Sequence, residues 1–190
     1  SSPSQVGSAT NWSQCSKCNS TTFAINSDGK LYAFGRNNDG SIGDGTTTSR
    51  DTPVQIGSLT DWLHISGGQT HVTALKTDGT IWTWGEGNKG QLGTGSTTAT
   101  SCPVQVGSLT TWASAGAGLS HSTALKTDGT IWTWGYNSTG QLGDGTTTNR
   151  SSPVQVGGLT TWASISGAAG GQHTTGIKTD GTIWKWGYAA

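Results

Sequence analysis

The chain has no methionine, a single glutamate (Glu86) and few charged residues for its length of 190. Charged side chains make up 11% of the residues, and ten basic residues balance ten acidic ones. A neutral chain offers no basic surface for nucleic acid and no polybasic patch for a membrane. No apolar stretch approaches the roughly 20 residues of a spanning helix. We therefore expect neither nucleic acid nor a membrane among the partners.

Motifs for covalent chemistry are also missing. No serine stands in a G-x-S-x-G turn, no G-x-x-x-x-G-K-[ST] phosphate loop occurs, and no two carboxylates pair at an evident site. Asp44 and Asp144 recur in G-D-G-T loops, but Thr94 replaces them in the intervening copy, which weakens the case for calcium. The sequence therefore predicts no catalytic residue, no cofactor and no metal, and a protein that is not an enzyme.

Cysteines are few, and their number is odd. Cys15 and Cys18 form one C-x-x-C, and Cys102 stands alone before a proline. A structural zinc site needs about four ligands, and no second ligand pair is present. Two interpretations remain for the C-x-x-C: a local Cys15–Cys18 disulfide in a secreted chain, or two small buried thiols.

What the chain does have is an internal repeat. Residues 124–135 (ALKTDGTIWTWG) are identical to residues 74–85, and degenerate copies occupy 24–35 and 176–187. Apolar and β-branched residues flank an Asp-Gly pair in each copy, which predicts a β-hairpin with a two-residue type I′ turn. A single hairpin is marginal in water, so four copies indicate one unit stacked on itself.

The period of the repeat is 50 residues. The only prolines follow it, a tryptophan follows each proline at a fixed interval, and a two-residue insertion in 166–173 delays the last copy; the prolines are Pro3, Pro53, Pro103 and Pro153. Each unit contains a proline-led strand, a small-residue strand after the tryptophan, and two hairpin arms. Four antiparallel strands in about 50 residues are typical of a propeller blade. We expect an all-β propeller-type domain over 1–190, with repeats at about 3–52, 53–102, 103–152 and 153–190.

Residues 121–145 (HSTALKTDGTIWTWGYNSTGQLGDG) carry a more specific pattern. They resemble the repeat of the regulator of chromosome condensation family nearly throughout. Residues 71–95 match closely, with Gly87 where asparagine is usual, and residues 21–45 match loosely, with Thr21 in place of histidine. The resemblance implies a β-propeller, and the usual ring in that family has seven blades, whereas this chain has four copies.

The two ends of the chain are complementary in strand content. An N-terminal proline strand (1–7) has no blade of its own, and the last copy lacks its proline strand. The strand could complete the fourth blade within the chain, although four blades would each have to turn about 90° rather than about 51°. Alternatively, two chains exchange strands in an eight-blade ring, chains donate strands head to tail in a filament, or the sequence is an excised piece of a longer propeller. The geometry favours strand donation between chains or an excised piece, and the lack of an initiator Met and signal peptide agrees with a processed or excised segment.

Three histidines share one repeat position: His71, His121 and His173. The position predicts strand histidines that hydrogen-bond the backbone of a neighbouring blade. A ring of metal ligands around the axis is the other interpretation, but Thr21 would break that ring.

Four asparagines stand in N-glycosylation sequons: Asn11, Asn19, Asn137 and Asn149. Threonine runs at 46–48 and 146–148 are candidate O-glycan loops. Low charge, abundant threonine and glycine, and near-identical repeats favour an extracellular, cell-surface or particle-surface glycoprotein.

Two functional hypotheses follow. The first is a non-enzymatic structural or adhesive module that forms oligomers or filaments by strand donation and contacts itself, another protein or a glycan through the loops at 36–50, 86–100 and 136–150. The alternative is an intracellular protein-interaction propeller, either a scaffold or an exchange factor for a small GTPase, as the family resemblance implies.

Overall fold

The computed structural model describes residues 2–167 and 171–188. The described residues form fifteen β-strands, and they contain no helix that is long and apolar enough to cross a membrane. The strands divide into four antiparallel sheets, which we call blades 1 to 4. Blade 1 contains β1 (Trp12–Cys18), β2 (Thr21–Asn26), β3 (Leu31–Gly35) and β4 (Arg50–Gln55); blade 2 contains β5 (Trp62–Gly67), β6 (His71–Lys76), β7 (Ile81–Gly85) and β8 (Thr100–Gln105); blade 3 contains β9 (Trp112–Ala117), β10 (His121–Lys126), β11 (Ile131–Gly135) and β12 (Arg150–Gln155); and blade 4 contains β13 (Trp162–Ser166), β14 (His173–Lys178) and β15 (Ile183–Gly187).

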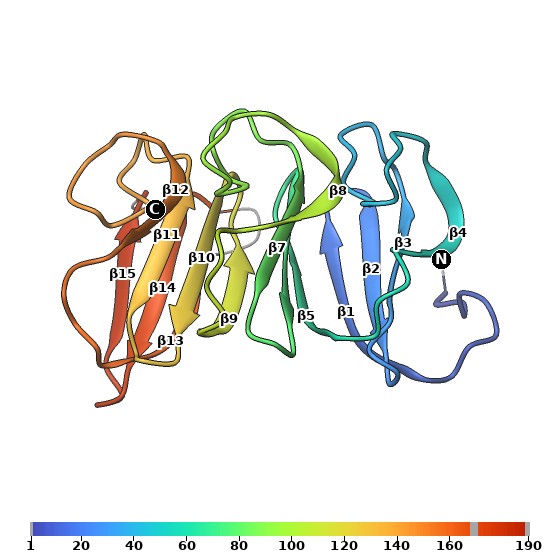
Figure 1. The fold of residues 1–190 in the computed structure, drawn as a ribbon, viewed down its shortest axis with the longest axis horizontal. Helices are drawn as coiled ribbons and strands as arrows, with labels where there is room; N and C mark the ends of the chain where they lie inside the picture. The colour runs from blue at the N-terminus through green and yellow to red at the C-terminus, as the bar shows by residue number, and fades with distance from the viewer. Residues whose placement is uncertain (1, 168–170, 189–190) are drawn as a thin grey trace.

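The blades stand side by side in a row that does not close on itself (Figure 1). Within each blade the strands pair in chain order. The first strands of successive blades, β1, β5, β9 and β13, contact one another. Polar groups join these strands: the Ile65 amide donates to Gln14 Oε1 at 2.8 Å, and the Ala117 amide donates to Ser66 Oγ at 3.1 Å. The first strands are therefore the inner strands of the propeller, and the proline strands lie at its outer rim.

The repeated hairpin is confirmed, but the predicted turn type is wrong. In blade 3, Leu125 pairs with Ile131, and the Gly129 amide donates to the Lys126 carbonyl at 3.1 Å. Gly129 has φ +78°, whereas Asp128 is not among the described residues with positive φ. The loop is thus a turn followed by one left-handed glycine, rather than a type I′ turn in which both central residues have positive φ. Asp128 instead accepts hydrogen bonds from the backbone and hydroxyl of Thr130, at 2.9 and 2.6 Å.

The hydrophobic core lies between blades rather than inside one sheet. Each blade packs aliphatic residues of its hairpin against the tryptophans of the next blade, as with Ile81 against Trp112 and Trp134. Aromatic rings meet edge to face across the blade 1–blade 2 interface, with the Phe23 and Trp84 ring centroids 6.2 Å apart, and within blade 2, with those of Trp62 and Trp82 6.4 Å apart. The tryptophans are therefore mainly packing residues, as their repetition predicts.

The chain ends lie at opposite ends of the row. Residues 2–7 form no strand and stay beside blade 1, whereas blade 4 has three strands at the other end (Figure 1). Gln5 and Val6 line a cavity of about 250 Å³ together with Trp12 and Tyr32 of blade 1. In the single chain the N-terminal segment therefore does not complete blade 4, and pairing with another copy stays a prediction.

Candidate interaction surface

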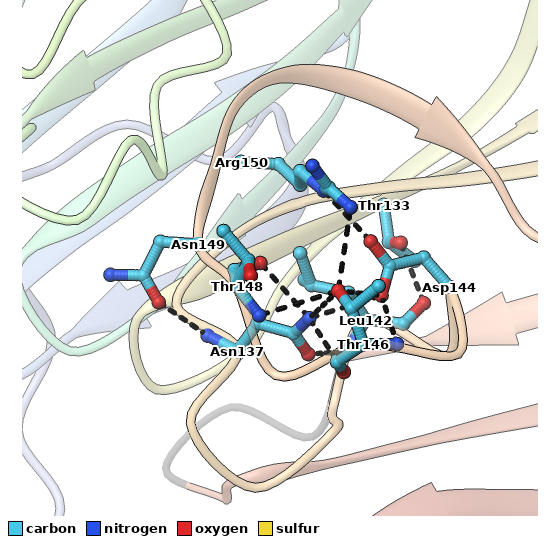
Figure 2. Close-up of polar contacts among 8 residues, drawn as sticks. All are labelled: Thr133, Asn137, Leu142, Asp144, Thr146, Thr148, Asn149 and Arg150. Carbon is cyan, nitrogen blue, oxygen red and sulfur yellow. Dashed lines mark hydrogen bonds and ion pairs between the residues drawn. The ribbon is translucent and has the colours of Figure 1, made fainter.

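The loops that follow the hairpins of blades 1 and 3 are each built around one buried asparagine, Asn37 and Asn137. In blade 3 the Asn137 amide nitrogen donates to the carbonyls of Thr146 and Thr148 at 3.1 and 3.0 Å, and its oxygen accepts from the Leu142 amide at 3.0 Å (Figure 2). Thr133 of β11 donates to the Leu142 carbonyl at 2.7 Å. One asparagine thus ties three points of the loop together, and the strand threonine fixes the loop to its own blade.

An ion pair closes two of these loops. Arg150 Nε donates to Asp144 Oδ2 at 2.8 Å, and the Thr146 amide donates to Asp144 Oδ1 at 3.0 Å (Figure 2). Burial acts to raise the pKa of Asp144, but the hydrogen bonds from Thr146 and Arg150 outweigh it and lower the pKa to about 2. Asp44 and Arg50 repeat this arrangement in blade 1, with Arg50 Nε donating at 2.7 Å.

The loop of blade 2 keeps the same course without the asparagine or the ion pair. Gly87, Thr94 and Thr100 occupy the positions of Asn137, Asp144 and Arg150. The carbonyl of Thr98 lies so close to Gly87 that a Cβ at Gly87 would contact it. Close backbone approach therefore takes the place of the asparagine hydrogen bonds in this loop.

The first half of each loop lies inside the blade–blade interface. Trp84 donates its indole N–H to the Ser41 carbonyl of the preceding blade at 2.7 Å, and Trp134 donates to the Gln91 carbonyl at 2.9 Å. We expected these loops to be free for partners, but much of each loop is internal. The exposed residues are the tips, such as 145–149, and a few positions earlier in the loops, namely Arg36, Asn38, Asp39, Asn88, Lys89 and Ser138.

The repeated histidines also bridge blades. His71 Nε2 lies 3.0 Å from Ser122 Oγ of blade 3, and His121 Nε2 lies 3.0 Å from Thr174 Oγ1 of blade 4. Ser122 donates its hydroxyl hydrogen to the Gln91 carbonyl at 2.8 Å, so Nε2 of His71 carries the proton of the His71–Ser122 bond. Burial lowers the pKa of His71 to about 3 and that of His121 to about 4. The partner is thus a side-chain hydroxyl, whereas the sequence predicted a backbone group.

No metal centre forms from these histidines. In residues 2–167 and 171–188, no three His, Cys, Asp or Glu side chains gather closely enough to hold an ion. Nδ1 of His71 is buried without a polar partner, and a Cβ at Gly68 would contact the His71 ring at Nδ1 (2.7 Å) and at Cε1 (2.5 Å). Ring packing against glycine therefore explains the bare nitrogen.

The structure does not contain the Cys15–Cys18 disulfide. Both thiols are free, as is that of Cys102. Cys15 and Cys18 lie three residues apart on β1, which is about 10 Å along an extended strand, and their side chains point to opposite faces. Burial, and then the charge of Asp39, raise the pKa of Cys18 to about 12. The alternative of a buried thiol fits Cys18, whereas Cys15 is exposed.

The four sequons differ in accessibility. Asn11, Asn19 and Asn149 are exposed. Asn137 is fully buried and its amide nitrogen is committed to loop carbonyls, so the folded protein cannot carry a glycan there. Glycosylation at the other three asparagines stays a prediction.

The two terminal faces expose residues that the interior interfaces bury. Ile183 of blade 4 is 75% exposed, whereas Leu31, Ile81 and Ile131 at the same position are completely buried. At the other end, Trp12 of blade 1 is 36% exposed. Its equivalents in the other blades are buried, namely Trp62, Trp112 and Trp162. These two faces are the apolar surfaces that lack a neighbouring blade.

Sequence reasoning missed the hydroxyl partners of the histidines. A signal existed: the residue after the repeated histidine is Ser122 or Thr174 in the two blades that follow a histidine-bearing blade. In blade 2, which follows Thr21 of blade 1, that residue is Val72. Reading each position against the next repeat, rather than within one repeat, would have revealed the pairing.

Comparison with known proteins agrees with this architecture. The family model described as "Regulator of chromosome condensation (RCC1) repeat" matches residues 28–75, 78–125 and 128–177. No match is found among curated proteins.

Solved structures share the fold at low identity. The human WBSCR16 structure superposes with a TM-score of 0.82 at 19% identity, covering 93% of this chain and 47% of its own. Yeast RCC1 (Prp20), solved with Kap60 bound, has a TM-score of 0.81 at 20% identity, covering 96% of this chain and 45% of its own.

A third similar structure has a comparable extent. The computationally designed Ika4 protein has a TM-score of 0.51 at 13% identity, covering 98% of this chain and 96% of its own. Against WBSCR16 and Prp20, by contrast, the chain spans about half of the longer protein. With the family model matching three successive repeats over most of its length, this chain belongs to the family of proteins built from the RCC1 repeat.

Proposed function

We propose that the protein is a structural or adhesive module whose copies join end to end by strand donation. The observation that carries this proposal is the match between the two ends. Blade 4 stops at β15, and residues 2–7 (SPSQVG) repeat the sequence of the strands that pair with the equivalents of β15. Residues 2–7 therefore carry the sequence of a fourth blade strand, and the described part of blade 4 has three strands.

The interior blades define the register of the proposed pairing. In blade 3, Gln155 of β12 lies opposite Trp132 of β11, and the amide of Val156 donates to the Ile131 carbonyl at 2.9 Å. The equivalent contacts would place Gln5 of one copy opposite Trp184 of the next. The amide of Val6 would then donate to the carbonyl of Ile183.

Donation would also bury the two exposed apolar ends. Ile56 and Val106, the equivalents of Val6, are each 1% exposed, whereas Val6 itself is 47% exposed in the single chain. In the interior, the tryptophan that begins the following blade covers the position of Ile183, as Trp112 covers Ile81. Val6 and Trp12 belong to one continuous segment. A single incoming copy would therefore supply both the valine that pairs beside Ile183 in the sheet and the tryptophan that packs on its face.

Two copies make the simplest closed assembly. Eight blades would each turn by about 45°, close to the turn of about 51° in a seven-blade ring, and the assembly would have two-fold symmetry. An open head-to-tail filament uses the same contact without closing. Either product presents the exposed loop tips at regular intervals, which suits a repetitive scaffold or adhesive surface.

We place this module outside the cell or on a particle surface. The threonine-containing tips at 47–49 and 145–149 are exposed, and three sequon asparagines are accessible to modification. Protein binding is the function class that we propose for this module; Prp20, which shares the fold, was solved with Kap60 bound.

Replacing one residue of the donated strand tests the proposal. Val6→Pro removes the amide hydrogen that would bond the Ile183 carbonyl, in a segment that has no strand in the single chain. We expect sedimentation velocity to show multimers for the native chain and an association at least about tenfold weaker for the variant, from one lost hydrogen bond and poorer packing. Ser8→Pro, which lies outside the pairing strand, is the matched control and should associate normally.

A native chain that stays monomeric across the accessible concentration range would contradict the proposal. Equal association of Val6→Pro and the native chain would also contradict it. In that second case the copies would join through some other surface.

A further inference from the structure

We infer that the face of blade 4 is matched to the face of blade 1 of a second copy through a His173–Thr22 contact. This inference rests on the proposed end-to-end assembly and identifies residues that give it specificity. It comes from comparing the three interior interfaces with the two faces that have no neighbour.

At the position of the repeated histidine, the three interior interfaces contain either a histidine–hydroxyl pair or a threonine–valine pair. Between blades 2 and 3, His71 Nε2 meets the hydroxyl of Ser122 at 3.0 Å, and between blades 3 and 4, His121 Nε2 meets the hydroxyl of Thr174 at 3.0 Å. Each histidine on one blade is thus answered by a hydroxyl on the next blade.

Between blades 1 and 2 both partners change together. Thr21 replaces the histidine, and its hydroxyl turns back to its own loop, 3.0 Å from Ser41 Oγ. The facing residue of blade 2 is Val72, which is fully buried. A hydroxyl at Val72 would face no histidine, so an apolar residue is the appropriate choice there.

The terminal faces complete this pattern. Blade 4 presents His173 on the side away from blade 3, at the position of His71 and His121. Blade 1 presents Thr22 on the side away from blade 2, at the position of Val72, Ser122 and Thr174. If blade 1 of a second copy follows blade 4, the histidine again meets a hydroxyl and the rule holds at all four junctions.

The position of Trp84 and Trp134 also bears on which blade can precede blade 1. Trp84 and Trp134 each donate an indole N–H to a loop carbonyl of the preceding blade, at 2.7 and 2.9 Å. Blade 1 has Phe34 at this position, which has no N–H to satisfy. A blade that precedes blade 1 therefore need not supply a loop carbonyl at this position.

The facing side of blade 4 also differs. Thr83 and Thr133 donate to the Leu92 and Leu142 carbonyls of their own loops, each at 2.7 Å, and the equivalent residue of blade 4 is Lys185. The aliphatic stem of Lys185 is long enough to pack beside the smaller ring of Phe34 in a neighbouring copy. On the His–hydroxyl pattern, we take blade 1 of a second copy as the occupant of this face.

Exchanging the two natural solutions tests the contact in the full chain. Thr22→Val leaves His173 without a hydroxyl, and His173→Thr leaves Thr22 without its histidine. We expect each single variant to weaken self-association by about ten- to a hundredfold, as for an unpaired buried polar group. The double variant His173→Thr/Thr22→Val removes both members of the pair, leaves no histidine facing an apolar residue, and should associate more tightly than either single variant.

Mixing the two single variants is the most decisive experiment, because mixing does not alter the fold of either variant. Half of the junctions in an alternating assembly then carry the native His–Thr pair and half carry the Thr–Val pair, so the mixture should associate more tightly than either variant alone. Thr110→Val, at an exposed position away from both faces, is the control for a general effect of threonine replacement.

The outcomes separate the two proposals. Multimers that form equally well in the native chain and in both single variants would overturn the His173–Thr22 contact while leaving strand donation intact. Single variants that weaken association without rescue by mixing would also overturn the contact. A native chain that never associates would overturn the proposed function itself, and the contact with it.

Discussion

The interior interfaces and the terminal faces of this molecule are built from the same sequence positions but have opposite environments. Ile131 is fully buried between blades 3 and 4, whereas Ile183, its equivalent in blade 4, is 75% exposed. Gly79 and Gly129 are approached by a carbonyl of the next blade, whereas Gly181 has open space around it. The comparison shows that a blade of this protein is completed by its neighbour, because little of the core lies within one sheet.

Truncating the equivalent isoleucines should give the largest contrast. Ile131→Ala removes a fully buried side chain and should lower the free energy of unfolding by about 2–5 kcal/mol. Ile183→Ala should change monomer stability by less than about 1 kcal/mol, because its side chain is mostly in solvent. Chemical denaturation at concentrations below self-association measures both. Similar losses for the two variants would mean that the terminal face is already covered in the monomer.

Substituting a glycine packed against the next blade and a glycine in open space should give the next largest difference in stability. Gly93 has φ +69°, and a Cβ there would lie 2.6 Å from the Trp134 indole nitrogen; Gly157 has φ +60° and open space. Gly157→Ala should cost about 1–2 kcal/mol from backbone strain alone. Gly93→Ala adds overpacking and should cost a further 1–3 kcal/mol or so. Thermal unfolding of the pair compares them, and equal costs would contradict the close packing of the loop on the next blade.

Acid should weaken the interior interfaces through the buried histidines. Burial lowers the pKa of His71 to about 3 and of His121 to about 4, from an unfolded value near 6.5. The unfolded chain then binds more protons than the folded chain below pH 6.5, so stability is lost as the pH falls from 6.5 toward the folded values. Each histidine should contribute a slope of about 1.4 kcal/mol per pH unit in that window.

His121→Gln provides the control for this pH dependence. The variant should show a smaller slope between pH 6.5 and about 4, as measured by urea unfolding at several pH values. An unchanged slope would mean that His121 does not titrate with unfolding.

The loop ion pair should have the smallest effect. Asp144→Asn removes the charge that binds Arg150 and should cost about 1 kcal/mol, since Arg150 is partly exposed. Thr94→Asp combined with Thr100→Arg would install the same pair in the loop of blade 2 and should gain no more than that amount. Denaturant midpoints measure both changes. A large loss from Asp144→Asn would show that the loop depends on the ion pair rather than on Asn137.

Much of the fold could be predicted from the period of the sequence. The interval between prolines gave the unit, and the Asp-Gly flanked by β-branched residues gave the hairpins, because these signals are local. The turn type failed, since Asp-Gly is compatible both with a two-residue turn and with a turn closed by a single left-handed glycine. The likeness of residues 2–7 to 152–157 predicts a strand, but these residues pair with none of the described strands.

The candidate surface was less predictable because it depends on contacts between repeats. Asn137 carries a sequon, yet its burial follows from the loop folding around it. The C-x-x-C suggested a disulfide, but the strand that carries it keeps Cys15 and Cys18 on opposite faces. The His–hydroxyl pairs were visible only as a change in one repeat answered by a change in the next.

A disulfide placed across the proposed junction tests the central claim most directly. In a chain with Cys15→Ser, Cys18→Ala and Cys102→Ser, the pair Gln5→Cys and Trp184→Cys would stand opposite each other in the register of Gln155 and Trp132. Under mild oxidation the account predicts covalent links between copies on a non-reducing gel, as dimers from a two-copy ring or a ladder from a filament. A product that stays at the monomer mass of 19.5 kDa would contradict end-to-end strand donation.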